Sequence, residues 1–395
     1  MGEWKETRFS EIATVIMGQS PASEFYNSDG KGFPFMQGNR TFGDRYPTID
    51  TYTTQITKKA PQNSILMSVR APVGDINIAP LEMCIGRGLC AINAKDGNNE
   101  FVRFLLSYNM PKLKLSENGT TFTAINGDNI KNLKILVPDL PTQKRIADIL
   151  STYDDLIENN NRRIVLLEKA AQELYKEWFV RFRFPGYETA KFENGLPTGW
   201  EIKKIGDIAR IKSGYAFKSE WWSDEGVPVI KIKDIQNTTI DFSDLSRVSE
   251  AHALLAKQFF VTEGDLLIAM TGATIGKLAL VPFSSERLVV NQRVGKFFLG
   301  DNPVSTVSFL YCTLQQNWIQ ELILMIASSN AAQPNISPFD IEKIKIIYNK
   351  EMVDDFNKQA SNLIEQIMLL RKRNQNLSKQ RDLLLPRLIS GKLEV

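Results

Sequence analysis

Polar and basic side chains gather in short stretches that the pattern places in loops, and their chemistry is that of hydrogen bonding to DNA. Arginine can bind guanine with two hydrogen bonds, and glutamine or asparagine can bind adenine in the same way. Most protein–DNA hydrogen bonds go to phosphate and sugar, so we expect fewer of these residues to contact a base than to contact DNA. The candidate DNA-binding residues are Gln37, Asn39, Arg40, Arg70, Arg87, Thr120, Thr121, Lys212, Tyr215, Lys218, Lys231, Lys233, Thr271, Asn291, Gln292, Arg293, Asn330 and Gln333.

Residues for catalysis or cofactor binding are largely missing. The chain has one histidine, His252, and three cysteines without a Cys-x-x-Cys pair, which disfavours histidine-based chemistry, zinc knuckles and disulfide frameworks. It contains neither a Gly-x-x-x-x-Gly-Lys-Ser/Thr phosphate loop nor an Asn/Asp-Pro-Pro-Tyr element, with which amino-methylating enzymes grip a target amine. Residues 86–91 imitate a dinucleotide fingerprint, but no helical pattern follows them. We therefore expect no catalytic, cofactor or metal site, and we expect His252 to be a surface residue.

Composition permits DNA binding without requiring it. The 395 residues are 43% hydrophobic and carry a formal net charge of +3. The N-terminus is charged, and no later run approaches the ~20 apolar residues of a membrane helix. We expect a cytoplasmic protein that contacts no membrane and keeps its thiols free and buried.

The elements that position the candidate loops occur twice in the chain. Residues 4–18 align without a gap on residues 200–214, with identities at Trp4/Trp200, Ile12/Ile208, Ala13/Ala209 and Gly18/Gly214. Short apolar or alternating runs, such as 64–69 and 265–270, lie between Gly, Asn, Asp and Pro residues. The sequence therefore predicts two copies of one β-rich, mixed α/β domain within an α+β fold.

Each copy is followed by a long heptad pattern, which predicts a helix. Apolar residues step by four and three along both segments, as they do in the seam of a coiled coil. Pro141 suits the first turn of the first helix, Pro185 follows its end, and Pro386 is expected to end the second helix. The predicted seam residues are Ile146, Leu150, Tyr153, Ile157, Asn160, Ile164, Leu167, Leu174, Trp178, Phe356, Leu363, Ile367, Leu370, Asn374, Leu377 and Leu384.

Each seam contains one central asparagine, which fixes the predicted register. A polar residue at a seam position costs stability unless it meets another one. We therefore predict an antiparallel coiled coil in which Asn160 faces Asn374, which also pairs Trp178 with Phe356. The alternative is that the two amphipathic helices pack separately, each on its own domain.

The whole chain resembles the specificity subunits of type I restriction-modification enzymes. Leu-Pro-Thr-Gln at 140–143, followed by Asp-Asp-Leu-Ile-Glu-Asn-Asn-Asn at 154–161, is similar to the first spacer helix of that family. Leu-Pro-Thr-Gly-Trp-Glu at 196–201 resembles the entry to its second domain, and 385–393 resembles its C-terminal ending. Residues 350–353 lack the Leu-Pro-x-Gln sequence that opens the first helix, so the sequence does not define where the second helix begins.

The resemblance implies a first target-recognition domain at 1–140 and a central spacer helix at 141–183. It further implies a linker and second recognition domain at 184–348, and a C-terminal spacer helix with a tail at 349–395. It also implies double-stranded DNA with a bipartite site as a partner, two modification subunits that bring S-adenosylmethionine, and restriction subunits that bring Mg and ATP. No cofactor is expected in this chain, which would catalyse nothing.

Two other interpretations stay open from the sequence. A divergent DNA methyltransferase would bind S-adenosylmethionine as an isolated chain. A protein-interaction scaffold would assemble without DNA and independently of salt, whereas phosphate contacts impose a steep salt dependence.

Overall fold

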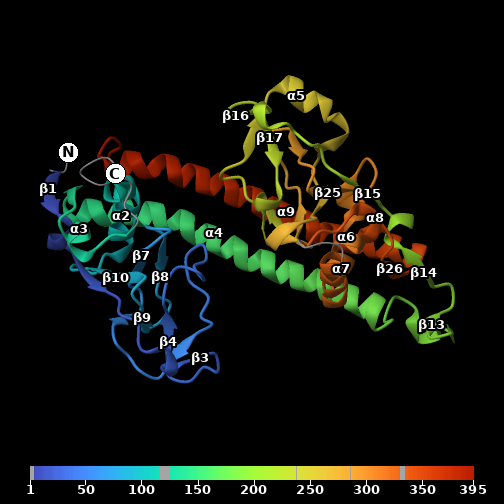
Figure 1. Ribbon diagram of the computed structural model, residues 1–395, viewed down its shortest axis with the longest axis horizontal. Helices are drawn as coiled ribbons and strands as arrows, with labels where there is room; N and C mark the ends of the chain where they lie inside the picture. Colours follow the sequence, from blue (N-terminus) through green and yellow to red (C-terminus); the bar gives the residue numbers. More distant parts are fainter. Residues whose placement is uncertain (1–3, 116–123, 237, 285, 330–333) are drawn as a thin grey trace. The chain divides into compact units, whose positions relative to one another are not determined.

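The computed structural model describes residues 4–115, 124–236, 238–284, 286–329 and 334–395. The chain forms two compact units, and each is described by itself: unit 1 is Met1–Glu158 with Asn376–Val395, and unit 2 is Asn159–Gln375. Each unit holds one β-rich domain and part of each of two long helices, α4 (Leu140–Tyr175) and α9 (Lys350–Ile389) (Figure 1). None of the described helices combines the length and apolar character needed to cross a membrane.

The β-rich domain of unit 1 is built on two main sheets, with strand orders β2-β10-β7-β8 and β3-β5-β4-β9-β6. A separate antiparallel pair, β1 with β11, joins the start of the domain to its end. The strands are β1 (Lys5–Arg8), β2 (Ala13–Met17), β3 (Tyr26–Asn27), β4 (Phe33–Met36), β5 (Tyr52–Thr53), β6 (Lys59–Ala60), β7 (Ile65–Ser68), β8 (Ile76–Ile78), β9 (Met83–Ile85), β10 (Leu89–Ala94) and β11 (Lys134–Val137). The helices of the domain are α1 (Phe9–Ile12), α2 (Asn99–Lys114) and α3 (Gly127–Lys131).

The β-rich domain of unit 2 repeats this plan, with sheets β15-β25-β22-β23 and β16-β20-β17-β24-β21. Strand β14 pairs with β26 as β1 pairs with β11. The strands are β12 (Phe192–Glu193), β13 (Leu196–Pro197), β14 (Glu201–Lys204), β15 (Arg210–Ser213), β16 (Trp222–Ser223), β17 (Val227–Ile230), β18 (Ile235–Gln236), β19 (Thr239–Ile240), β20 (Ser246–Val248), β21 (Phe260–Val261), β22 (Leu266–Ala269), β23 (Leu278–Leu280), β24 (Leu288–Val290), β25 (Val294–Phe298) and β26 (Lys345–Tyr348). The helices are α5 (Glu250–Leu255), α6 (Pro303–Leu314), α7 (Asn317–Ser329) and α8 (Pro338–Glu342).

The internal repeat is confirmed by this topology. Both five-stranded sheets contain one parallel pair at the same place in the order, β4 with β9 and β17 with β24. The matching glycines of the two copies, Gly18 and Gly214, are required for the same reason. A Cβ atom at Gly18 would lie 2.2 Å from the Gly86 carbonyl oxygen, and a Cβ atom at Gly214 would lie 2.4 Å from the Val290 carbonyl oxygen. Only glycine allows the chain to pass this close to the neighbouring strand.

Strands β7 and β22 lie at the centre of their domains because they are apolar on both faces. In β7, Ile65 and Met67 enter the core beneath α2, while Leu66 enters the core between the two sheets. In β22, the side chains alternate in the same way between two cores. A strand buried on both faces shows as a continuous apolar run, which explains the pattern that predicted these strands.

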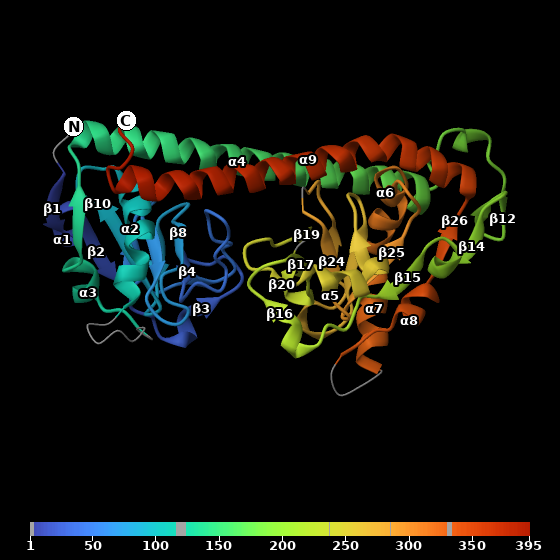
Figure 2. The same cartoon turned by 90° about the horizontal axis from the view of Figure 1, so that it is seen from above.

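In unit 1, the long helices are part of the domain core. Helix α2 covers one face of the β2-β10-β7-β8 sheet, and residues of α4 and α9 pack beside it (Figure 2). Ile146 and Leu150 of α4 and Leu388 of α9 are all almost completely buried there. The ends of the helices are thereby fixed to the domain.

Both long helices begin at side-chain caps. The Asp139 side chain accepts a hydrogen bond from the Thr142 amide over 3.0 Å, so that Pro141 falls in the first turn as predicted. The Asn349 side chain accepts one from the Met352 amide over 3.0 Å, and this cap fixes the start of α9 that the sequence left unclear.

The expectation that Pro386 ends the second helix is wrong. Helix α9 continues through Pro386 to Ile389, and Gly391 follows in the left-handed conformation at φ +72°. Proline costs this helix one hydrogen bond, but Leu388 and Ile389 are each 1% exposed in the unit 1 core. Burial of two large apolar side chains outweighs the lost bond.

The predicted seam residues lie on the buried or half-buried sides of α4 and α9, except Trp178, which is buried in the π-helical turn Lys176–Val180 that directly follows α4. In unit 2, Asn160 Nδ2 donates to Asn374 Oδ1 over 2.8 Å, and the rings of Trp178 and Phe356 meet edge to face at 5.8 Å. In unit 1, Leu150 and Leu384 belong to the same apolar cluster. The helices therefore pair antiparallel in the predicted register, and the alternative of separate packing is wrong.

Candidate nucleic-acid interface

In unit 1, candidate residues from separate parts of the sequence meet at one end of the two main sheets. Gln37 follows β4, Arg70 follows β7, and Arg87 lies in the turn between β9 and β10. Backbone hydrogen bonds join these segments: Val69 N donates to the Gly88 carbonyl over 2.9 Å, and Gly88 N donates to that of Gln37 over 3.0 Å. Three predicted residues thus share one surface.

The Gly-Arg-Gly sequence around Arg87 is a packing feature and does not form a phosphate loop. A Cβ atom at Gly88 would lie 2.4 Å from the Gln37 carbonyl oxygen, and one at Gly86 would lie 2.9 Å from the Gln37 Cα atom. The glycines let the turn press against the end of β4, while Arg87 between them remains exposed. Strand β10 begins at Leu89, so the glycines do not open a helix as those of a dinucleotide fingerprint do.

The hydrogen-bond frame around this turn is repeated in unit 2. Three backbone hydrogen bonds occur at matching places in the two units. Gly86 N donates to Met36 O as Asn291 N donates to Ile230 O, and Gln19 N donates to Ile85 O as Tyr215 N donates to Val290 O. Val69 N donates to Gly88 O as Met270 N donates to Arg293 O. Arg87 is thereby equivalent to Gln292. The same frame makes Gln37 equivalent to Lys231.

A further bond of the frame relates the segments after β7 and β22. Ile125 N donates to the Val69 carbonyl over 2.9 Å, and Ile336 N donates to that of Met270 over 3.0 Å. Arg70 is therefore equivalent to Thr271. The candidate residues of the two domains occupy common backbone positions and differ in side-chain chemistry.

Five candidates are available to an external ligand. Within the described parts of the chain, their side chains make no hydrogen bond or ion pair, and all five are exposed: Gln37, Arg70, Arg87, Gln292 and Arg293. Three of them are arginines, which match both phosphate oxygens and guanine.

Four other candidates are engaged within their own domain. Arg40 bonds both carboxylate oxygens of Asp50 over 2.9 and 2.7 Å, and its guanidinium group lowers the pKa of that carboxyl. Asn39 donates to Asp75 over 2.5 Å. Lys233 pairs with Asp234 and Asp244, and Lys231 lies 3.6 Å above the Trp222 ring centroid with Nζ bonded to Ser246. Each of these side chains therefore already has a partner within its own domain.

The remaining candidates lie in a strand, in the loops beside the unit 2 turn or outside the described residues. Lys212 lies within strand β15, where the prediction assumed a loop, while Tyr215 and Lys218 lie in the loop that follows this strand. Thr271 and Asn291 are half-buried beside the unit 2 turn. Thr120, Thr121, Asn330 and Gln333 lie outside the described residues.

The sequence analysis missed several residues around these turns. In unit 1, Gln19, Ser20 and Tyr26 line a hollow together with Gln37 and Arg87. In unit 2, the His252 ring stacks on Trp221 with centroids 4.3 Å apart, so His252 is half-buried and not simply a surface residue. The available signal was the matching positions of the aromatic residues Tyr26 and Trp222, each nine residues after the end of β2 or β15.

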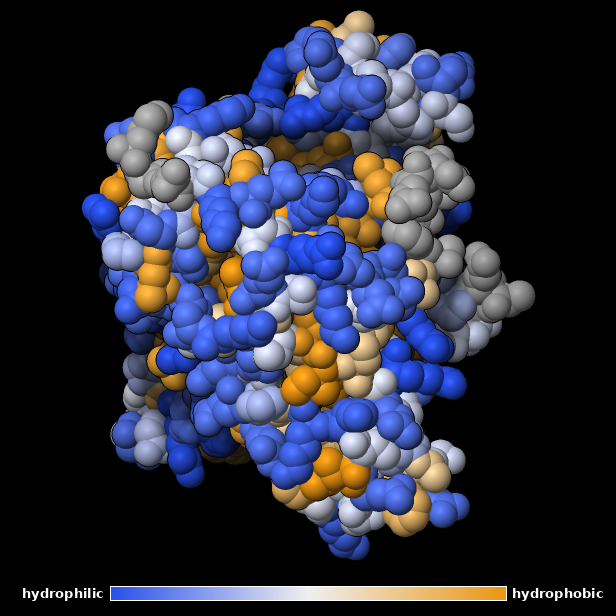
Figure 3. All heavy atoms as spheres, turned by 90° about the vertical axis from the view of Figure 1, so that its left-hand side faces the viewer, coloured by the Kyte–Doolittle hydropathy of each residue, from blue (hydrophilic) through white to orange (hydrophobic). Residues whose placement is uncertain are grey.

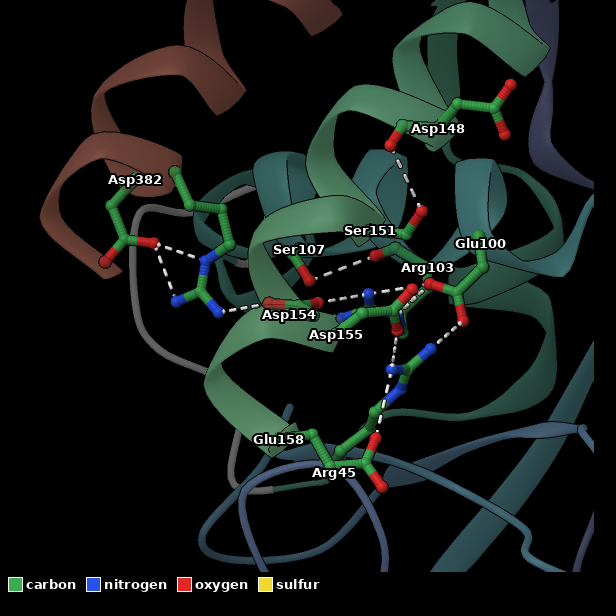
Figure 4. A network of polar contacts seen from close by, with 11 residues as sticks. Arg45, Glu100, Arg103, Ser107, Asp148, Ser151, Asp154, Asp155, Glu158 and Asp382 are labelled. Atoms are coloured by element: carbon green, nitrogen blue, oxygen red, sulfur yellow. Dashed lines mark hydrogen bonds and ion pairs between the residues drawn. The ribbon is translucent and has the colours of Figure 1, made fainter. Parts of the chain in front are cut away.

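An ion cluster in unit 1 joins the β-rich domain to both long helices. The Asp154 carboxylate on α4 accepts from Arg103 on α2 and from Arg381 on α9, each over 2.5 Å (Figure 4). Asp154 is 8% exposed. Burial lowers the pKa of Arg381, but its bonds to Asp154 outweigh burial and raise that pKa above its usual range. Figure 4 also shows Arg45, a residue of the β4–β5 loop, bound to acidic residues of α2 and α4.

Unit 2 contains a comparable cluster. Glu168 Oε1 on α4 accepts from Arg371 Nη2 on α9 over 2.7 Å, from Thr238 Oγ1 over 2.8 Å and from the Tyr311 hydroxyl of α6 over 3.2 Å. Arg371 is 7% exposed. Burial raises the pKa of Tyr311, which keeps its hydroxyl a donor. In each unit, a carboxylate of α4 and an arginine of α9 link the helices to the β-rich domain.

Comparison with known proteins agrees with this duplicated architecture. The family model described as "Type I restriction modification DNA specificity domain" matches residues 1–169 and again residues 197–350. The chain belongs to this family. Within the described residues, no group of three or more His, Cys, Asp or Glu side chains could hold a metal ion.

Two similar specificity subunits and one solved structure illustrate the likeness. The type I restriction enzyme MjaIX specificity subunit of Methanocaldococcus jannaschii is 27% identical over 415 residues, which span 100% of this chain and 94% of that protein. The HindI specificity subunit of Haemophilus influenzae is 26% identical over 336 residues, covering 69% and 72% of the two chains. A crystal structure of a type I restriction-modification S subunit from M. genitalium has the same fold, with a TM-score of 0.58 at 20% identity over 98% of this chain and 96% of that one.

Proposed function

We propose that this chain is the non-catalytic DNA specificity subunit of a type I restriction-modification complex, and that each β-rich domain reads one half of a bipartite, gapped DNA site. One observation carries the proposal: the same hydrogen-bond frame occurs twice and presents different polar side chains, such as Arg87 and Gln292. A common frame places the side chains alike against DNA, while different side chains select different bases.

The paired helices set the length of the gap. Helix α4 has 36 residues, and at 1.5 Å per residue it is about 54 Å long. One turn of B-DNA is about 34 Å long, so a helix of this length is sufficient for half-sites one turn apart. The Asn160–Asn374 pair fixes the register of the helices, and with it the gap.

The outer faces of the same helices dock the partner subunits. On α4, Leu156 is 47% exposed, Val165 62% and Leu166 66%, although the seam side of this helix is buried. The face of the molecule that lies on the left-hand side in Figure 1 is drawn in Figure 3. This face is mainly hydrophilic, with hydrophobic residues in separate groups among polar ones. Exposed apolar residues on a helix are suited to bind protein. Two modification subunits bind there and bring S-adenosylmethionine, and restriction subunits bring Mg and ATP.

The experiment lengthens both helices by one heptad at the boundary between the units, after Glu158 and before Asn376. Seven residues keep the seam in phase, and the contacts within each unit are retained. The control inserts seven residues after Gly97, an exposed turn position with open space around it. Each protein is assembled with its modification subunits, and methylated positions are mapped by long-read sequencing.

The heptad variant should read the same bases with a wider gap, by up to about three base pairs for about 10 Å of added helix. The control should keep the original gap. An unchanged gap in the heptad variant would refute the role of the helices as a spacer. Binding of S-adenosylmethionine by the chain alone would favour a methyltransferase, and assembly that is independent of DNA and salt would favour a scaffold.

A further inference from the structure

We infer that Arg87 and Gln292 are specificity-determining residues at one equivalent position of the two half-sites, where Arg87 selects guanine and Gln292 selects adenine. This inference rests on the proposed function. It depends on three observations: the two residues share a backbone position, they project from a fixed turn, and their side chains are free to bind.

The two residues occupy the same position of the same turn. In unit 1, Leu89 N donates to the Gly86 carbonyl over 3.0 Å, which closes a four-residue turn with Arg87 second. In unit 2, Val294 N donates to the Asn291 carbonyl over 2.9 Å, which closes the matching turn with Gln292 second. Each turn leads into an inner strand of a four-stranded sheet, β10 or β25.

Both turns are held on two sides by neighbouring segments. The first residue of each turn donates to the last residue of a strand, Gly86 to Met36 over 2.7 Å and Asn291 to Ile230 over 2.9 Å. The last residue of each turn accepts from a glycine, Leu89 from Gly18 and Val294 from Gly214, each over 2.9 Å. A reading side chain on so constrained a backbone loses little conformational freedom on binding.

The side chains themselves are exposed and unpaired. Neither Arg87 nor Gln292 makes a side-chain hydrogen bond or ion pair with any residue of the described ranges. The Arg40 side chain, by contrast, already donates through Nη2 to both carboxylate oxygens of Asp50. The donors of Arg87 and the amide of Gln292 are therefore among the polar groups that DNA can engage without breaking a bond between described residues.

An arginine lies beside each reading residue. The two domains place this arginine on different segments, and the same backbone hydrogen bond joins these segments in both domains. In unit 1, Arg70 follows Val69, whose amide bonds the Gly88 carbonyl. In unit 2, the position of Arg70 is Thr271, but the position of Gly88 is Arg293. Each domain thus keeps one additional cation beside the turn, which is suited to bind phosphate and to orient the reading residue.

Base selection follows from the geometry of the two groups. A guanidinium group donates to guanine O6 and N7 together, and a carboxamide donates to adenine N7 while it accepts from N6. Each such contact discriminates against a wrong base by about 5- to 150-fold. Exchange of the two side chains between the domains should therefore exchange the preferred purine at one position of each half-site.

The test uses the full chain assembled with its modification subunits and compares Arg87→Gln, Gln292→Arg and the wild type by methylation mapping. In Arg87→Gln, one guanine of the first half-site should become adenine with at least a 5-fold change in preference. In Gln292→Arg, one adenine of the second half-site should become guanine. The other half-site and the gap should stay unchanged in both variants. Arg8→Gln, which removes an exposed arginine of β1 in the same unit, controls for loss of charge.

Competition binding to oligonucleotides that vary the altered position provides a second measurement. A uniform loss of affinity for all four bases would show that Arg87 and Gln292 contact phosphate, and would overturn the inference. So would unchanged motifs in both variants. A wild-type complex that methylates no gapped motif would refute the proposed function itself, which separates the two failures.

Discussion

Replacement of Asp154 by alanine is predicted to loosen the attachment of the long helices to the recognition domain of unit 1. The Asp154 carboxylate is 8% exposed and accepts from Arg103 and Arg381, each over 2.5 Å. Alanine leaves two partly buried guanidinium groups facing a site without a carboxylate. Removal of one partner of a buried ion pair typically costs about 3–5 kcal/mol.

The expected cost here is smaller, because both arginines keep another partner. Arg103 still holds Glu100 over 2.7 Å, and Arg381 still holds Asp382 over 2.9 Å. The Arg381 side chain is also 28% exposed, which allows water to replace part of the lost interaction. We therefore expect Asp154→Ala to lower the free energy of opening in unit 1 by about 2–3 kcal/mol.

Hydrogen exchange followed by mass spectrometry measures this opening locally. A loss of about 2–3 kcal/mol accelerates exchange in peptides from 376–389 about 30- to 150-fold, under conditions where exchange reports the opening equilibrium. Peptides confined to unit 2 should not change. The matched control is Asp155→Ala, which removes a neighbouring carboxylate that is 64% exposed, so a cost below about 1 kcal/mol is expected. Equal effects of the two variants would refute the reasoning.

Three further predictions concern the helices and the thiols. Cysteines introduced at 157 and 377 should form a disulfide efficiently, because the Asn160–Asn374 register pairs these positions, and the yield is measured on a non-reducing gel. Asn160→Leu should destabilise unit 2 by about 1 kcal/mol in urea denaturation, because the partner amide loses a buried hydrogen bond. Burial raises the pKa of Cys90 to about 12 and also raises that of Cys312, so neither thiol should react with iodoacetamide at pH 8 until the protein is unfolded; modification of the folded protein would contradict the buried placement.

The coiled coil could be predicted from sequence because its signal is local. Apolar residues at heptad spacing specify one face of a helix, and one asparagine in each seam specifies the register. The end of α9 could not be predicted, because the burial of Leu388 and Ile389 that carries the helix past Pro386 is a tertiary effect. Local proline rules describe the lost hydrogen bond but not the core that compensates for it.

For the candidate interface, the sequence supplied residue types but not their arrangement. Short sequence matches around Pro34/Pro228 and Leu66/Leu267 relate Gln37 to Lys231 and Arg70 to Thr271, but loop insertions leave the register between Arg87 and Gln292 open in the sequence alone. The backbone hydrogen bonds of the structure provide that correspondence. The ion clusters could not be predicted for another reason. Helix α4 contains many charged residues, and no sequence feature distinguishes buried Asp154 from exposed Asp155.

The most direct test of the central claim is to assemble the wild-type chain with its modification subunits and map methylation across a genome. The account predicts a single asymmetric motif made of two different half-sites separated by a gap of fixed length. Replacement of one β-rich domain by that of a relative should then change one half-site only. A stable complex that methylates no motif, or a contiguous motif without a gap, would contradict the claim that two equivalent domains read two halves of one site.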